Sequence, residues 1–144
     1  MPGKLKPIPK PNEVLIRVHA SCVNSGDARI RALRVPKGMG LIVRLMFGWS
    51  GPRQPILGTD FAGIIEAIGS DVTQFTIGDQ VFGSLGTKTG THAEYVTVSE
   101  DGTILQKPEN TSMEETVSFV FGGLTALSFL KHKASLRPGE HVLI

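Results

Sequence analysis

The side chains that could act as nucleophiles or metal ligands are few and scattered. The 144-residue chain contains one cysteine, Cys22, and four histidines. A single cysteine excludes an internal disulfide and any zinc site that needs two or more thiolates. We expect each histidine to be structural or solvated rather than a metal ligand, at positions His19, His92, His132 and His141.

A short polar loop, Val23-Asn24-Ser25-Gly26-Asp27, offers a different kind of chemistry. The Asn24 side chain can close an Asx turn, because a short amide readily hydrogen-bonds to backbone groups a few residues away. The same amide can donate a hydrogen bond to a ligand without titrating. Both roles are open at this point.

Short strands must position this loop. Residues 13–20 alternate, with Val14, Ile16 and Val18 on one face, which predicts a half-buried strand. From Gly58 onward, short apolar runs are separated by Gly, Asp and Thr, which is typical of strands joined by tight turns. These further strands are predicted within residues 58–68, 78–83, 91–98 and 104–107.

The C-terminal part changes to a helical pattern. Ser112 and Glu115 have the spacing of a capping box, and apolar residues follow at helical intervals up to Leu130. The pair Gly122-Gly123 predicts an interruption that gives two short helices or a kinked one. Residues 136–144 predict a turn and the first residues of a new strand. Because a strand needs neighbours, we expect the polypeptide to continue.

Composition restricts the class of protein. Apolar residues make up 40% of the chain, which argues against disorder, and the 17 glycines and 9 prolines fit a turn-rich β protein. A net charge of +2 gives no argument for a nucleic-acid partner. No segment resembles a signal peptide, and the longest uncharged run, residues 116–130, is shorter than the roughly 20 residues of a bilayer span. We therefore expect a cytoplasmic protein.

A basic stretch lies between residues 24 and 58. It contains six arginines and lysines and no acidic residue after Asp27, and it includes the apolar run 41–49. We favour a solvated excursion whose apolar residues fold back on the core. The alternative is a basic, apolar lip that contacts a membrane surface or the tail of an apolar substrate.

Several motifs occur together in a characteristic order. They are Pro55-Ile-Leu-Gly-Thr-Asp-Phe-Ala-Gly63, the glycine-bounded run 69–83, Thr91-His-Ala-Glu-Tyr-Val96 and Leu124-Thr-Ala126. The set resembles the N-terminal, GroES-like catalytic domain of the medium-chain dehydrogenase/reductase superfamily, and within it the zinc-independent quinone oxidoreductases. The resemblance covers nearly the whole chain.

This resemblance implies a mainly β fold, a GroES-like, partly open β-barrel with short C-terminal helices. Residues 4–110 would form the barrel. Residues 111–144 would form a helical connection and the first strand of a Rossmann cofactor domain that is absent from this chain. No G-x-G-x-x-G motif occurs in the sequence, so NADPH would be bound mainly by that missing domain.

The same resemblance locates the positions of a catalytic zinc. Zinc-dependent relatives have thiolate and imidazole ligands where this sequence has Asn24, Thr59 and Gly122. Neutral amide and hydroxyl oxygens are weak ligands for Zn²⁺, so we expect no zinc. Without a Lewis acid, reduction of a conjugated acceptor is easier than oxidation of an alcohol.

The resemblance also implies roles for individual residues. Asn24 would contact the nicotinamide or the acceptor oxygen, and Asp27 would either buttress the loop or take part in catalysis. Thr125 would line the nicotinamide pocket, cap a second helical segment, or do both. Arg29 stands where quinone reductases often have tyrosine. It would pair with a cofactor phosphate or an anionic substrate, or simply be solvated.

The leading hypothesis is therefore the catalytic-domain portion of a zinc-free oxidoreductase that transfers hydride from NADPH to a quinone or enone. Two alternatives are a relative of the zinc-type alcohol dehydrogenases and a non-catalytic barrel that serves in binding. We expect a small-molecule substrate, no nucleic acid, and a homodimer in the full-length form. The isolated 144-residue chain is expected to be inactive.

Overall fold

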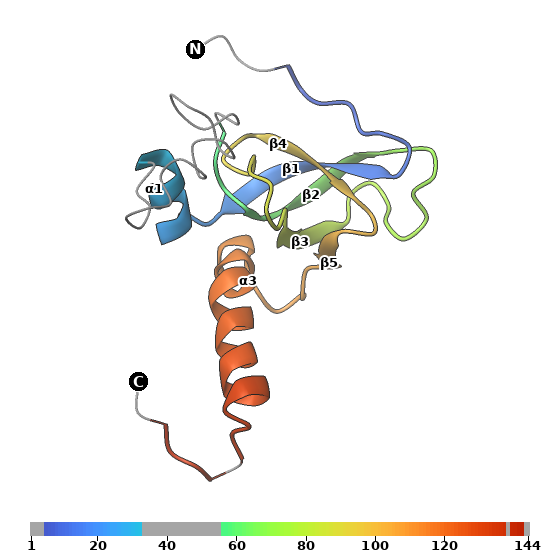
Figure 1. Cartoon of the computed structure of the whole chain (residues 1–144). Coiled ribbons are helices and arrows are strands. Elements are labelled where there is room, and N and C mark those ends of the chain that lie inside the picture. The colour runs from blue at the N-terminus through green and yellow to red at the C-terminus, as the bar shows by residue number, and fades with distance from the viewer. Residues whose placement is uncertain (1–4, 33–55, 138, 143–144) are drawn as a thin grey trace.

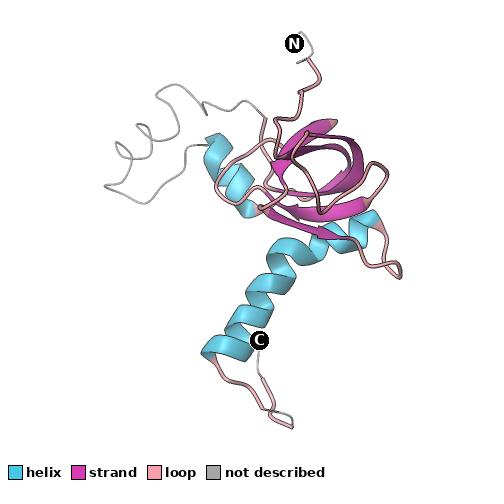
Figure 2. Ribbon diagram, turned by 90° about the vertical axis from the view of Figure 1, so that its right-hand side faces the viewer, coloured by secondary structure: helices cyan, strands magenta, loops and turns pink. Residues whose placement is uncertain are grey.

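The computed structural model describes residues 5–32, 56–137 and 139–142. Its centre is one five-stranded antiparallel sheet with the strand order β4-β1-β2-β3-β5, and the sheet curls into a half-barrel (Figures 1 and 2). The strands are β1 (Glu13–Ser21), β2 (Asp60–Ile68), β3 (Gln80–Ser84), β4 (Tyr95–Ser99) and β5 (Thr103–Gln106). The expected mainly β, GroES-like architecture is confirmed.

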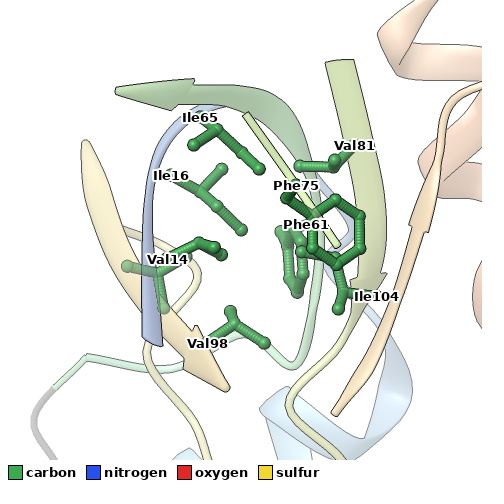
Figure 3. Close-up of a cluster of buried hydrophobic side chains, with 9 residues drawn as sticks. Val14, Ile16, Phe61, Ile65, Phe75, Val81, Val98 and Ile104 are labelled. Atoms are coloured by element: carbon green, nitrogen blue, oxygen red, sulfur yellow. The ribbon is translucent and has the colours of Figure 1, made fainter. Parts of the chain in front are cut away.

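The strand β1 lies inside the sheet and pairs with both β2 and β4. Its alternating face, with Val14 and Ile16, points into the curled sheet, as predicted (Figure 3). Leu15 on the opposite face is also only 3% exposed, so this strand is more deeply buried than the sequence pattern indicated. The core cluster consists of Val14, Ile16, Phe61, Ile65, Phe75, Val81, Val96, Val98 and Ile104.

The strand predicted over residues 91–98 begins later, at Tyr95. Residues 91 and 92 instead donate backbone hydrogen bonds to the chain before β2, from Thr91 to Gly58 and from His92 to Leu57. This segment therefore connects two loops at one end of the half-barrel rather than extending the sheet.

The helix α3 (Met113–Leu127) begins with the predicted capping box. The Ser112 hydroxyl accepts from the Glu115 N–H at 3.1 Å, and the Glu115 carboxylate accepts from the Ser112 N–H at 2.9 Å. The prediction of two short helices is wrong, because α3 continues through Gly122-Gly123 into a π-helical turn, η1 (Ser128–Lys133). The ribbon changes direction along this element, which fits the kinked alternative (Figure 2).

Only the first part of α3 packs against the sheet. Thr116, Val117 and Val120 are buried, whereas the following part extends away from the strands (Figure 1). Large apolar side chains are exposed along this following part, with Phe121 at 59% and Leu124 at 58% exposure. Beyond the helix, a turn joins Arg137 to Glu140, but the expected strand is not formed by the described residues up to Val142.

A helix that the sequence analysis did not predict, α1 (Ser25–Ala32), follows β1 directly. Most of the basic stretch, including the apolar run 41–49, lies outside the described residues. Within the described part of the chain, no helix is both long enough and apolar enough to cross a bilayer.

Candidate functional site

The loop between β1 and α1 is held by reciprocal hydrogen bonds between Asn24 and Asp27. The Asn24 Oδ1 atom accepts from the backbone N–H groups of Gly26, at 2.8 Å, and Asp27, at 3.3 Å. In return, Asp27 Oδ2 accepts from the Asn24 N–H at 3.0 Å. The pattern is that of a capping box with shorter side chains. The Asx turn is formed, and Asn24 is the N-cap of α1.

Asp27 extends this arrangement beyond its own helix. Its side chain is only 4% exposed, and its Oδ1 atom accepts from the Gly58 N–H at 3.0 Å. Both carboxylate oxygens are thus occupied by backbone donors from two different loops. The geometry makes Asp27 a positioning group that joins the Asn24 loop to the start of β2.

Gly58 is required at its position for two reasons. Its φ angle is +86°, in the left-handed region that favours glycine. A Cβ atom here would also overlap the Thr91 hydroxyl and the His92 ring. The close approach of these two side chains is therefore possible only because residue 58 has no side chain.

His92 connects a third loop to the site. Its Nε2 atom lies 3.0 Å from the Cys22 carbonyl oxygen. A carbonyl can only accept, so Nε2 carries the hydrogen in this contact. The His92 ring therefore fixes the backbone just before Asn24.

Beneath this loop lies a small buried polar group. The Ser21 hydroxyl donates to the Asp60 carbonyl at 2.8 Å and contacts the Thr91 hydroxyl at 2.8 Å. The Asp60 side chain is 2% exposed, and its Oδ2 atom has no hydrogen-bond partner. Burial, and secondarily the Asp60 carboxylate, raise the pKa of the Cys22 thiol. That thiol donates to the Val117 carbonyl of α3 at 3.3 Å.

The sequence analysis did not single out Asp60 or the Gly58–His92 contact. A carboxylate at the head of an apolar, glycine-flanked strand was the available signal for Asp60. The Gly58–His92 contact joins residues 34 positions apart, and no local pattern identifies such a pair.

The residues at the three zinc positions of the family do not fit a zinc ion. Asn24 Oδ1 already accepts two backbone hydrogen bonds, and Gly122 has no side chain to offer. Thr59 supplies a neutral hydroxyl, which is a poor zinc ligand. Across the described ranges, no three His, Cys, Asp or Glu side chains gather in a way that could hold a metal.

Thr125 is not brought to this site by the described structure. It is exposed in the part of α3 that follows the packed residues. It does not cap a second helix, because α3 runs from Met113 to Leu127 without a break. Among the described residues, no hydrogen bond joins Thr125 to Asn24 or Asp27.

Comparison with known proteins identifies the family. Residues 10–109 match the family model described as alcohol dehydrogenase GroES-like domain. Over 138 residues the chain is 38% identical to the quinone oxidoreductase of Sus scrofa, a match that covers 96% of this chain and 38% of the relative. A zinc-type alcohol dehydrogenase-like protein of Staphylococcus aureus is 35% identical over 140 residues, covering 95% of this chain and 37% of the relative.

A solved structure shows the same similarity. The quinone oxidoreductase from Coxiella burnetii superposes with a TM-score of 0.75 at 34% identity, over 95% of this chain and 41% of that protein. The chain thus spans about two fifths of the length of the proteins that it matches. It belongs to the alcohol dehydrogenase GroES-like domain family, within the medium-chain dehydrogenase/reductase superfamily, and it is similar to the quinone oxidoreductases of that superfamily.

Proposed function

We propose that this chain forms the catalytic-domain part of an oxidoreductase that transfers hydride from NADPH to a quinone or enone-type acceptor. Its similarity to quinone oxidoreductases supports the reaction class. The observation that carries the proposal is the difference in hydrogen bonding between the two ends of the Asn24 side-chain amide. Its oxygen is held by two backbone N–H groups, while its Nδ2 group has no hydrogen-bond partner among the described residues.

A fixed, neutral donor is suited to this reaction. When a conjugated carbonyl accepts hydride at carbon, negative charge develops on its oxygen, and a preorganised hydrogen-bond donor stabilises that charge. The Asn24 Nδ2 group can donate two hydrogen bonds and does not titrate. We therefore assign Asn24 to the acceptor oxygen or to the nicotinamide amide beside it.

Asp27 acts through Asn24 in this proposal. Its buried carboxylate accepts from the Asn24 N–H and the Gly58 N–H, so it holds in place the backbone that carries the Asn24 amide. In this proposal Asp27 is a positioning residue, in line with the buttressing alternative.

NADPH, when bound, would supply the hydride. Because the sequence has no G-x-G-x-x-G motif, we assign the pyrophosphate site to a Rossmann domain outside this chain. Residues 4–110 would form the catalytic barrel and residues 111–144 the connection to that domain. Thr125, in this connection, would contact the nicotinamide side of the cofactor. The chain's own contribution is to hold the acceptor and exclude water.

The test exchanges the residues at two helix caps. Asn24→Ser keeps an effective N-cap but removes the amide donor. In the full-length protein, with NADPH and benzoquinone, we expect kcat/KM to fall about 100-fold, with a melting temperature within a few degrees of wild type. The reciprocal variant Ser112→Asn makes the opposite exchange at the cap of α3 and should retain wild-type turnover.

Two outcomes would count against the proposal. Unchanged quinone reduction by Asn24→Ser would remove Asn24 from the site. Turnover that is abolished by a chelator and restored by zinc would instead favour the alcohol dehydrogenase alternative, despite the poor ligand set.

A further inference from the structure

A pocket of about 520 Å³ lies directly beside the Asn24 loop. Most of its lining is apolar and comes from Val23, Ala28, Ala32 and Leu57. Its size is within the range of small-molecule sites and suits a fused aromatic ring system. Since Val23 precedes Asn24 and the pocket also borders Asp27, a molecule bound here would adjoin the proposed reaction site.

The cationic side chain of Arg31 also lines this pocket. It lies in the last turn of α1 and is exposed. Within the described residues it forms no ion pair. The sequence has no aspartate or glutamate between Asp27 and Asp60, so the segment that continues from α1 cannot supply a carboxylate. A guanidinium that forms no ion pair, beside an apolar wall, favours an anionic ligand group.

The other polar groups of the pocket are already engaged. Each Asp27 oxygen accepts a backbone N–H group. The His92 Nε2 group faces the Cys22 carbonyl, so the ring forms a fixed wall. Among the described residues that line the pocket, Arg31 is thus the one whose side chain has hydrogen-bond donors left for a charged ligand group.

We propose that this pocket binds acceptor molecules that combine an apolar ring system with a single anionic group, and that Arg31 recognises the anion. The inference rests on the proposed function, because it assigns the occupant as the acceptor whose carbonyl meets Asn24. A phosphate of the cofactor is the other source of the same charge, and the experiment separates the two.

The test compares two quinones that differ only in charge. Anthraquinone sulfonate and its uncharged sulfonamide are titrated against the full-length protein. For Arg31→Gln, the Kd of the sulfonate should rise about tenfold, whereas that of the sulfonamide should change less than about twofold. Arg29→Gln is the matched control, because Arg29 lies on the same helix and is exposed but is not among the residues that line the pocket. The inference thus takes the solvated alternative for Arg29 and assigns the anion to Arg31. Arg29→Gln should leave both Kd values within about twofold.

The outcomes distinguish this inference from the proposed function. An unchanged sulfonate Kd in Arg31→Gln, or an equal loss in Arg29→Gln, overturns the inference. An approximately tenfold weaker affinity for NADPH in Arg31→Gln also overturns it, because Arg31 would then serve the cofactor. Sulfonate binding that depends on Arg31, in a protein that reduces no quinone, would retain the anion-binding pocket and remove the reductase assignment.

Discussion

The two described α-helices begin with the same hydrogen-bonding pattern but use it differently. At α3, Ser112 and Glu115 exchange hydrogen bonds at an exposed position, and within the described structure their capping bonds stay inside this helix start. At α1, Asn24 and Asp27 make the equivalent exchange, but Asp27 is buried and also binds the Gly58 N–H. One cap starts a helix; the other also fixes the relative position of two loops.

This difference explains why a loop can carry the candidate site. A side-chain amide is useful as a fixed donor only if its backbone does not move. The Asn24 loop is held by Asp27 on one side and by the His92 ring on the other. The α3 cap makes no such hydrogen bond to another loop of the described chain.

The largest effect is expected where the external contacts meet. Gly58→Ala would place a Cβ atom against Thr91 and His92 at a positive φ angle, so strain and overpacking add. We expect the free energy of unfolding to fall by about 4 kcal/mol, measured by chemical denaturation. Gly78→Ala is the control, because Gly78 also has a positive φ but open space around it. Gly78→Ala should lower the free energy of unfolding by about 1 kcal/mol.

Equal losses in the two glycine variants would contradict the packing argument. They would show that backbone conformation alone explains the requirement for glycine, and that Gly58, Thr91 and His92 are not tightly packed against one another.

A direct comparison of the two caps should give the next largest difference. Asp27→Asn replaces one oxygen with an NH₂ group that faces a backbone N–H, leaving a buried donor without a partner. We expect a loss of about 2 to 3 kcal/mol in the free energy of unfolding. Glu115→Gln should change it by less than about 0.5 kcal/mol, since glutamine also serves in a capping box. Losses of similar size would mean that the Asp27–Gly58 contact adds little to the local cap.

The sequence predicted one of these caps and missed the other for a physical reason. Ser112 and Glu115 precede an apolar run with helical spacing, so the cap and the periodicity agree. After Asn24 and Asp27, the helix has no apolar stripe: Ile30 is its one large apolar residue, and it stands between Arg29 and Arg31. The hydrogen bond from Gly58 to Asp27 joins residues 31 positions apart, so no local sequence pattern indicates it.

Cooperativity also explains why the C-terminal part of the structure differs from the sequence-based prediction. Each glycine in a helix costs about 1 kcal/mol relative to alanine. The capped start and the buried face of α3 sustain the helix through Gly122-Gly123, so the local penalty does not end it. Conversely, residues 141 and 142 have the composition of a strand start, but strands form only beside a partner, and the described chain provides none there.

Cys22 connects the Asn24 loop to α3, and the smallest expected effect concerns its reactivity. Its thiol donates to the Val117 carbonyl in α3, while its own carbonyl binds His92 next to Asn24. Burial and the Asp60 charge raise the thiol pKa, so less thiolate is present at a given pH than in the unfolded chain. Alkylation by iodoacetamide should therefore be several-fold slower in the folded protein, and the alkylation rate should rise at a higher pH than in the unfolded chain.

The variant Asp60→Asn should reverse only part of the shift in the thiol pKa, since burial is its larger cause. Equal alkylation rates in folded and unfolded protein would show that the connection between the Asn24 loop and α3 opens freely, and the rigidity argued for the α1 cap would then rest on Asp27 alone.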